Sequence, residues 1–376
     1  MTRLFTSESV SDGHPDKICD QISDAILDEC LRQDPLSRVA VETMVKSDLV
    51  VVAGEITTNA VLDFHHIIRE VLTRIGYDDP QWGFDPWQIK VLTNITEQSP
   101  EIARSVIKRA TIGAGDQGMM FGYAVKETPE LMPLPIQAAH NLMRVHKAMR
   151  VAQRKRRTPD TPLLGPDAKA QITVRYSDDK PLEFDTVVLS VLHDSNLDGL
   201  VEYTRSMIEN WYKTFGYDQY VTGNTKILIN PAGPWLVGGP KSDAGVTGRK
   251  IIVDTYGGAA RHGGGAFSGK DPTKVDRSAA YAARHLAKFV CSHPDLSRHR
   301  AEVQISYAIG IPDPISVHVY GMQEEAVKHM LDHFKIDLTP AGIIDRFNLR
   351  QPMYRQTAAF GHFGRSEFPW EQVSTS

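Results

Sequence analysis

The stretch from Gly238 to Arg277 combines the two ingredients of an anion-binding loop, dense glycine and repeated cations. It holds ten of the chain's 28 glycines and seven lysines or arginines. Glycine lets backbone amides approach a ligand without side-chain obstruction, and the cations favour a negatively charged ligand. The pattern predicts a site for a polyphosphate, although glycine loops with scattered lysines also form ordinary turns.

Two glycine motifs match well-known nucleotide-binding signatures, but the residues that follow each of them do not fit the structure that the signature requires. Residues 113–118 match G-x-G-x-x-G, but the apolar run MMFGYAV that follows predicts a strand where a dinucleotide-binding motif needs a helix. Residues 264–270 match G-x-x-x-x-G-K, but Asp271 stands where a P-loop needs a hydroxyl for magnesium. An ordinary phosphotransferase is therefore disfavoured.

The end of the glycine-rich stretch predicts a helix start beside the anion. Asp271 and Pro272 are typical of an N-cap and a first helical residue, so a helix beginning there would aim its positive dipole end at the glycine loop. Lys270 and Lys274 flank that end. Because two lysines oppose the helix macrodipole, their presence indicates that an anion is expected there.

Several further polar residues have both a structural and a functional interpretation. Asp16 and Asp276 each fall in the first turn of a predicted helix, where the dipole favours a carboxylate without any function. Beside a polyphosphate they would be magnesium ligands. His14 could cap its helix or donate to a phosphate or leaving oxygen. Glu42 and Glu55 lie on predicted strands, where a carboxylate is usually only solvated.

The elements that must position these residues follow the order helix, hairpin, helix three times. The helices have apolar residues at helical spacing and the hairpins alternate around short turns. The predicted ranges are 15–32, 38–46, 48–56 and 59–75 in the first unit, 135–157, 170–192 and 196–214 in the second, and 274–291, 301–320 and 322–334 in the third. A further strand is predicted at 89–95.

The repeated order indicates duplicated domains. The predicted fold class is α+β, with three similar units that each carry helices on one face of a largely antiparallel sheet. The predicted domains are 1–101, 113–233 and 234–373. Residues 102–112 are a candidate active-site lid, or equally a plain linker.

The composition of the chain restricts the classes of binding partner and the cellular location that we expect. The formal net charge of −4 and a pI near 6.4 argue against nucleic acid or an anionic membrane as a general partner. Cys19, Cys30 and Cys291 are odd in number and widely spaced, which predicts buried thiols in a reducing compartment. The N-terminus lacks the apolar core of a secretory signal, and the longest aliphatic run, 49–53, is too short to span a bilayer. We expect a cytoplasmic protein.

Longer motifs along the chain resemble those of S-adenosylmethionine synthetases, also called methionine adenosyltransferases. GAGDQGMMFGY at 113–123 and GGGAFSGKD at 263–271 are similar to the two signature motifs of the family. The supporting matches are TSESVSDGHPDK at 6–17, GEITT at 54–58, TGRKIIVDTYGG at 247–258, KVDRSAAYAAR at 274–284, SYAIG at 306–310 and GHFGR at 361–365.

The resemblance implies a reaction in two steps and an architecture for it. The methionine sulfur attacks C5′ of ATP and displaces the whole triphosphate chain, which is then hydrolysed to phosphate and diphosphate. The implied fold is three α+β repeats about a pseudo-threefold axis. The implied active sites lie between two subunits of a homodimer or of a dimer of dimers.

The same resemblance implies roles for individual residues. Contacts to the phosphates or the leaving oxygen would come from His14, Lys169, Arg249, Lys250, Lys270 and Lys274. Two Mg2+ ions would be held by Asp16 and Asp276, and one K+ ion by Glu42. The nucleoside would lie against Asp167, Trp235, Asp243 and Ala266. Methionine would be oriented by Glu55, Gln98, Asp116, Asp243 and Lys274.

Two segments depart from the pattern of the family. Pro234 and Trp235 stand where an Arg-Phe pair is usual, which removes a backbone donor and a cation but keeps a ring for stacking on adenine. Residues 99–112 carry Arg104, Lys108 and Arg109 and little acid, so unusual lid kinetics or substrate range is expected. The competing hypothesis is a non-catalytic nucleotide-binding paralogue. The presence of Asp16 and Asp276 together with Lys270 and Lys274 disfavours it, because a protein that only binds a nucleotide does not need both metal-ligating and leaving-group residues.

Overall fold

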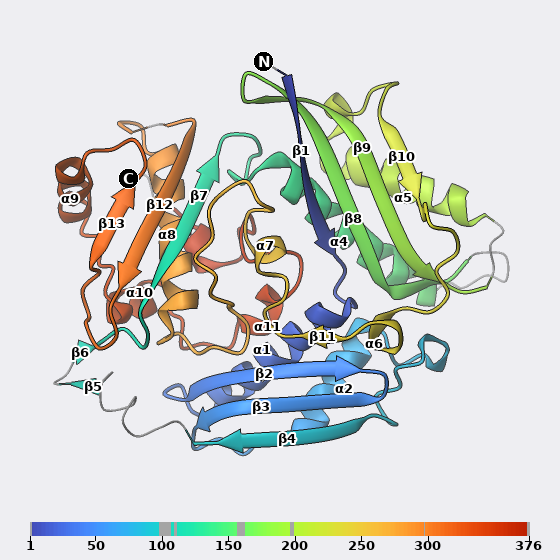
Figure 1. Ribbon diagram of the computed structural model, residues 1–376, viewed down its shortest axis with the longest axis horizontal. Coiled ribbons are helices and arrows are strands. Elements are labelled where there is room, and N and C mark those ends of the chain that lie inside the picture. Colours follow the sequence, from blue (N-terminus) through green and yellow to red (C-terminus); the bar gives the residue numbers. More distant parts are fainter. Residues whose placement is uncertain are drawn as a thin grey trace.

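The computed structural model describes residues 2–97, 107–108, 111–155, 162–195, 199–296 and 298–373. Within these ranges the chain forms open sheets with helices packed on them, which confirms the α+β class (Figure 1). The strand orders are β1-β8-β9-β10, β11-β2-β3-β4 and β13-β12-β7, with a separate two-stranded pair β5-β6.

The described strands are β1 (Thr2–Val10), β2 (Arg38–Lys46), β3 (Leu49–Thr57), β4 (Lys90–Thr96), β5 (Ile107–Lys108), β6 (Thr111–Ile112), β7 (Gly118–Val125), β8 (Leu164–Ser177), β9 (Lys180–His193), β10 (Lys226–Ile229), β11 (Gly245–Val246), β12 (Arg300–Tyr307) and β13 (Ser316–Val319). The described helices are α1 (Pro15–Gln33), α2 (Phe64–Ile75), α4 (Leu134–Lys155), α5 (Leu200–Thr214), α6 (Gly239–Ser242), α7 (Ile251–Asp254), α8 (Val275–Ser292), α9 (Glu324–His333), α10 (Pro340–Phe347) and α11 (Tyr354–Thr357), with 3-10 turns at Pro80–Trp82, Asp218–Tyr220 and Pro369–Glu371.

All three predicted hairpins are confirmed. β2 pairs antiparallel with β3, β8 with β9 and β12 with β13. After each of the first two hairpins the chain forms a helix and then returns as a strand parallel to the second strand of the hairpin. These added strands are β4, beside β3, and β10, beside β9. In the third sheet the extra strand is β7, which runs antiparallel to β12.

Helix boundaries differ from the predictions at two informative places. α2 begins at Phe64 rather than at residue 59, because Asp63 is its N-cap and accepts a hydrogen bond from the His66 amide. α8 begins at Val275, one residue after the start of the predicted range 274–291, and its N-cap is Lys274 rather than Asp271. The prediction that Asp271 caps a helix is therefore wrong: its carboxylate accepts the Thr273 amide and the Lys274 ammonium within a turn that precedes the helix.

Strand β1 is absent from the sequence-based prediction. It lies beside β8 and pairs with it over its whole length (Figure 1). In this register Thr2 lies opposite Ser177 and Val10 opposite Lys169. This pairing carries the N-terminal residues into a sheet built from the middle of the chain. The segment that follows β1, ending in His14, is thereby fixed beside β8.

Helices bury the inner faces of the sheets in two apolar clusters. The larger cluster includes residues of α1, α2 and α8, and the smaller one residues of α4, α5 and the β8-β9 hairpin. The three cysteines are buried and unpaired, as predicted. No helix among the described residues is long and apolar enough to cross a bilayer.

Candidate active site

His14 caps helix α1, and the geometry assigns different tasks to its two ring nitrogens. Nδ1 accepts a hydrogen bond of 3.2 Å from the Asp16 amide. Burial, together with the Lys250 ammonium, lowers the pKa of His14 to about 3. The ring is therefore neutral at physiological pH, and since Nδ1 accepts, its proton sits on Nε2 as a donor. Capping and donation are compatible here.

Asp16, in the first turn of α1, lies beside two cationic side chains of the glycine-rich stretch. Its carboxylate accepts the Lys250 ammonium at 2.5 Å and the Val246 amide at 3.0 Å, and Arg249 Nε lies 3.7 Å away. Burial opposes ionisation, but the hydrogen bonds from Lys250 and Val246 outweigh it and lower the pKa of Asp16. The carboxylate is ionised at neutral pH.

Three more aspartates continue this face of α1, and sequence reasoning missed them. Asp20 accepts the Gly248 amide at 2.9 Å, Asp24 accepts the Gly269 amide at 2.8 Å, and Asp28 accepts the Tyr354 amide at 2.8 Å. Together with Asp16 they form the aspartate row of α1, residues 16, 20, 24 and 28. Their spacing of four residues, which puts side chains on one helix face, was the available signal.

The aspartate row fixes the backbone of the glycine-rich stretch. Asp24 also binds Arg277 in a bidentate ion pair of 2.7 and 2.8 Å, and both side chains are fully buried. Gly269 has φ of +80°, and a Cβ there would lie 1.9 Å from Val41 O. Glycine is thus required where the loop passes between α1 and β2.

Lys270 and Asp276 form a second pairing of cation and carboxylate at the start of α8. Lys270 Nζ lies 2.6 Å from Asp276 Oδ2, and both side chains are partly exposed. A Cβ on Gly265 would lie 2.5 Å from Asp276 Oδ1. The absence of a side chain at Gly265 therefore leaves this carboxylate oxygen open to the loop.

Lys270 also lies on the edge of the β2 sheet. It forms an isolated antiparallel bridge with Ala40, which is paired on its other side with Glu55. Residues paired across strands share a face, and so do residues two apart in a strand. Lys270, Glu55 and Glu42 are therefore brought to one face of this sheet, the face on which Glu42 and Glu55 are exposed.

Asp167 and Lys169 lie on β8 near the His14 end of the site. Asp167 is 3% exposed, its Oδ2 accepts the Gly239 amide at 2.8 Å, and its buried Oδ1 has no hydrogen-bond partner. Burial raises the pKa of Asp167 to about 7. Lys169 is exposed opposite Val10, close enough for its charge to lower the pKa of His14.

The remaining predicted residues are dispersed around these contacts. Asp243 and Asp116 are exposed and accept the amides of their own following residues. A Cβ on Gly248 would lie 2.6 Å from Ala266 Cβ, so Ala266 touches the loop that carries Arg249. Trp235 is half-buried and exchanges two hydrogen bonds with His193. Gln98 and most of the candidate lid lie outside the described residues.

The neutral His14 and the charged residues of the site therefore form two groups. The first is His14, Asp16, Asp167, Lys169, Arg249 and Lys250; the second is Glu42, Glu55, Lys270, Lys274 and Asp276. Within the described ranges no hydrogen bond or ion pair joins a charged side chain of one group to the other. Their loops do touch, through the contact between Gly248 and Ala266.

The arrangement of Asp16 and Asp276 fits a magnesium ion whose coordination is completed by substrate and water, rather than a metal ion bound by protein ligands alone. Among the described residues no three His, Cys, Asp or Glu side chains converge as a metal cage. Mg2+ usually takes one or two carboxylates and completes its shell with phosphates and water. Asp276 Oδ1 faces a glycine and is open to a ligand, which fits this pattern. Asp16 is buried, and its two oxygens accept the Val246 amide and the Lys250 ammonium, so a metal ion there would share this carboxylate with both donors.

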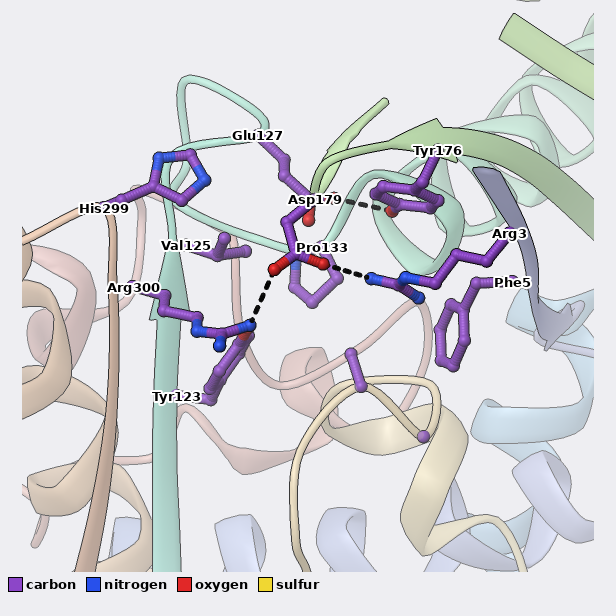
Figure 2. A pocket seen from close by; sticks show the side chains of 12 residues that line it. Arg3, Phe5, Tyr123, Val125, Glu127, Pro133, Tyr176, Asp179, His299 and Arg300 are labelled. Carbon is purple, nitrogen blue, oxygen red and sulfur yellow. Dashed lines mark hydrogen bonds and ion pairs between the residues drawn. The ribbon is translucent and has the colours of Figure 1, made fainter. Parts of the chain in front are cut away.

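A different pocket, drawn in Figure 2, contains none of the predicted site residues. It lies between β1-β8 and β7-β12 and encloses about 120 Å³. Asp179 lies between Arg3 and Arg300, 3.2 and 3.6 Å from them, and Tyr176 donates a hydrogen bond of 2.8 Å to Glu127 (Figure 2). Its two arginines thus share Asp179, and its second carboxylate, Glu127, is bound by the Tyr176 hydroxyl and the Leu134 amide.

Comparison with known proteins accounts for nearly the whole chain. The N-terminal, central and C-terminal domain models of S-adenosylmethionine synthetase match residues 2–100, 111–235 and 237–372. The chain is also 50% identical over 383 residues to the S-adenosylmethionine synthase of Treponema denticola, an alignment that covers 98% of this chain and 95% of that protein. The chain belongs to the S-adenosylmethionine synthetase family.

Proposed function

We propose that the glycine-rich stretch holds the triphosphate of ATP in a methionine adenosyltransferase active site. The chain synthesises S-adenosylmethionine from ATP and L-methionine: the sulfur attacks C5′, the triphosphate leaves, and it is then hydrolysed to phosphate and diphosphate. The observation that carries the site assignment is that two helix starts each pair a lysine with an aspartate, Lys250 with Asp16 and Lys270 with Asp276.

Charge stabilisation is the main task of the site. The leaving group is a tripolyphosphate of roughly four negative charges, so fixed donors and cations contribute most of the catalysis. His14 donates from Nε2, and Lys169, Arg249, Lys250, Lys270 and Lys274 supply positive charge. Because His14 is neutral, it contributes a hydrogen bond and no net charge.

Asp16 and Asp276 would hold two Mg2+ ions, and Glu42 one K+ ion. Bound Mg2+ neutralises phosphate oxygens that the lysines alone leave charged. In this arrangement Lys250 and Lys270 contact the phosphates as well as the aspartates. The nucleoside would lie against Asp167, Trp235, Asp243 and Ala266, and methionine against Glu55, Gln98, Asp116, Asp243 and Lys274.

We also propose a homodimer or a dimer of dimers with active sites between subunits. Met44, Val51 and Leu92 form one cross-strand row on the face of the β2-β3-β4 sheet that carries Glu42 and Glu55. Met44 is 40% and Leu92 57% exposed. A second copy covering this apolar row would also close over the second group of charged residues and bring cations of its own.

The finer architecture is part of the same proposal. The three units would be related by a pseudo-threefold axis, with domains 1–101, 113–233 and 234–373 and a lid at 102–112. The repeated passage from hairpin through helix to parallel strand supports it for the first two sheets. Buried free thiols support a reducing, cytoplasmic location.

One assay tests the function. Purified protein is incubated with ATP, methionine and Mg2+, and S-adenosylmethionine, phosphate and diphosphate are followed together. Equal amounts of the three products are expected. Formation of ADP would indicate phosphoryl transfer instead, and binding of ATP without any sulfonium product would indicate a non-catalytic paralogue.

A further inference from the structure

A second cationic pocket lies among the helices. It is bordered by α1, α2, α4, α11 and the segment after α11, and it encloses about 290 Å³. Its described lining residues include no Asp or Glu but four cations, Arg74, Lys147, Arg355 and Arg365. We call it the helix-side pocket. None of these residues belongs to the site described above.

The carboxylates around the helix-side pocket do not balance its cations. One oxygen of Glu70 is shared by Arg74 at 2.6 Å and Arg355 at 3.1 Å. Glu367 pairs with Arg365, at 2.9 Å. Asp12 is shared by Lys147 and by Arg150, each at 2.8 Å. Three carboxylates thus serve five cations.

A sixth cation adds to this excess. Arg144 donates to the Phe360 carbonyl and to Asn141, without a carboxylate partner among the described residues. Burial and the charge of Arg365 lower the pKa of Arg144 to about 10. Burial also lowers the pKa of Arg365 itself, despite Glu367. Burial is the largest cause of both shifts, and the charge of Arg365 adds to it at Arg144, so two largely buried guanidinium groups lie close together beside the pocket.

The remaining lining residues are mostly apolar. Val71, Ile75, Ala359 and Phe360 supply hydrocarbon, and Lys147 Nζ lies 5.5 Å from the centre of the Phe360 ring. Guanidinium groups match phosphate oxygens in bidentate geometry. From the unbalanced cations and the apolar wall we infer that the helix-side pocket binds a small organic phosphate, with the phosphate between the arginines and Lys147 and the apolar part against Phe360.

The pocket is connected to the start of α1. Lys147 holds the Asp12 carboxylate, and Gln21 donates a hydrogen bond of 2.7 Å to the Asp12 carbonyl. Asp12 lies two residues before His14. A ligand that draws Lys147 away from Asp12 would therefore act on the segment that positions His14. This inference goes beyond the proposed function and does not depend on it.

Phenyl phosphate is a suitable probe, because it has one phosphate and one apolar ring. Its binding to the full chain is measured by calorimetric titration without ATP or methionine. We expect saturable binding that is tighter than that of inorganic phosphate. The double variant Arg74→Gln/Arg355→Gln should weaken it about tenfold or more, as loss of two charged hydrogen bonds predicts.

Two controls separate this pocket from other sites. Arg32→Gln removes an exposed α1 arginine that is also paired with a carboxylate, and it should leave affinity unchanged. The titration is repeated with Lys270→Ala, because phenyl phosphate can also occupy the triphosphate site when ATP is absent; the binding that Arg74→Gln/Arg355→Gln weakens should persist in Lys270→Ala. Equal affinity of wild type, Arg74→Gln/Arg355→Gln and Arg32→Gln, disappearance of all saturable binding in Lys270→Ala, or no saturable binding in wild type would overturn the inference. Inorganic phosphate binding as tightly as phenyl phosphate would contradict an organic ligand.

A labelling experiment tests the same inference without substitutions. Phenylglyoxal modifies accessible arginines, and peptide mass spectrometry reports each position. Phenyl phosphate should slow modification of Arg74 and Arg355 in the unsubstituted protein and leave Arg32 unaffected. Modification of Arg74 and Arg355 at the same rate with and without phenyl phosphate would contradict the pocket assignment.

Discussion

The imidazole of His14 is buried beside ammonium groups and accepts the Asp16 amide, so it enters catalysis as a neutral donor. Asparagine at this position keeps a good N-cap but removes the Nε2 donor. His14→Asn should therefore fold normally and lower kcat by about a hundredfold, typical of a lost contact to developing charge. Steady-state kinetics and thermal melting measure the two effects.

The pH profile gives His14 a second test. With a pKa near 3, the ring does not titrate between about pH 5 and 9. The wild-type kcat profile should therefore contain no ionisation that disappears in His14→Asn. An inflection near pH 6.5 that is lost in the variant would show that His14 acts as a titrating acid or base.

Asp167 has a buried carboxylate whose Oδ1 lacks a partner, and its folded pKa is raised to about 7. Since the unfolded value is about 3.9, its contribution to stability is fully present below about pH 4 and is lost as pH rises through about 7. Asp167→Asn removes this loss. Without ligands, the variant should gain stability relative to wild type between pH 5 and pH 8.5.

Urea unfolding at the two pH values measures that change. The difference in free energy of unfolding, variant minus wild type, should be more positive at pH 8.5. An equal difference at both values would mean that Asp167 is not held protonated by burial. Activity should fall in the same variant, because Asp167 is proposed to contact the nucleoside.

At the scale of elements, the aspartate row of α1 supports the glycine-rich stretch. Asp24→Asn leaves the fully buried Arg277 without its counter-charge and should cost about 3–5 kcal/mol of unfolding free energy. Glu29→Gln, which breaks an exposed pair on the same helix, should cost less than about 1 kcal/mol. Urea titration at pH 7.5 compares them, and similar costs would contradict the structural role of the row.

Local patterns predicted the elements better than the contacts between them. The alternation in 38–56 and 170–192 gave the hairpins, because it reports a half-buried face directly. Strand β1 was not predicted, because its sequence, TRLFTSESV, is largely polar. It forms a strand by pairing with β8, which lies more than 150 residues away in the sequence. The start of α8 was predicted within one residue, but its cap was assigned to the wrong residue, because Asp271 accepts hydrogen bonds from the Val39 amide and Lys274 instead of capping the helix.

The candidate site shows the same limit. The residue types at His14, Asp16, Lys270 and Asp276 indicated an anion and a metal, since those types have few other uses near glycine loops. No sequence pattern pairs Asp24 with Arg277 or Asp16 with Lys250, because those contacts join segments more than 200 residues apart. Only the folded chain brings them together.

For the whole molecule, the proposed assembly makes a concentration-dependent prediction. Leu92 lies in the exposed apolar row of the β2-β3-β4 sheet, and a charge there should oppose burial against a second copy. Leu92→Asp should therefore sediment as a 41.9 kDa monomer at concentrations where wild type is a dimer or tetramer, and it should lose activity on dilution.

Val61→Asp is the matched control for Leu92→Asp. Val61 is 83% exposed, lies outside the strands of the sheet, and should tolerate the charge without any change of mass or activity. Analytical ultracentrifugation distinguishes the two variants. An unchanged mass of Leu92→Asp would place the subunit interface elsewhere.

The central claim is that the glycine-rich stretch holds the departing triphosphate, and Lys270 tests it most directly. The kcat for S-adenosylmethionine formation is compared between Lys270→Ala and Lys241→Ala, an exposed lysine of the same stretch. Loss of a charge contact to the leaving group predicts a fall of about a hundredfold or more for Lys270→Ala and little change for Lys241→Ala. An unchanged kcat in Lys270→Ala would show that the loop is only a turn.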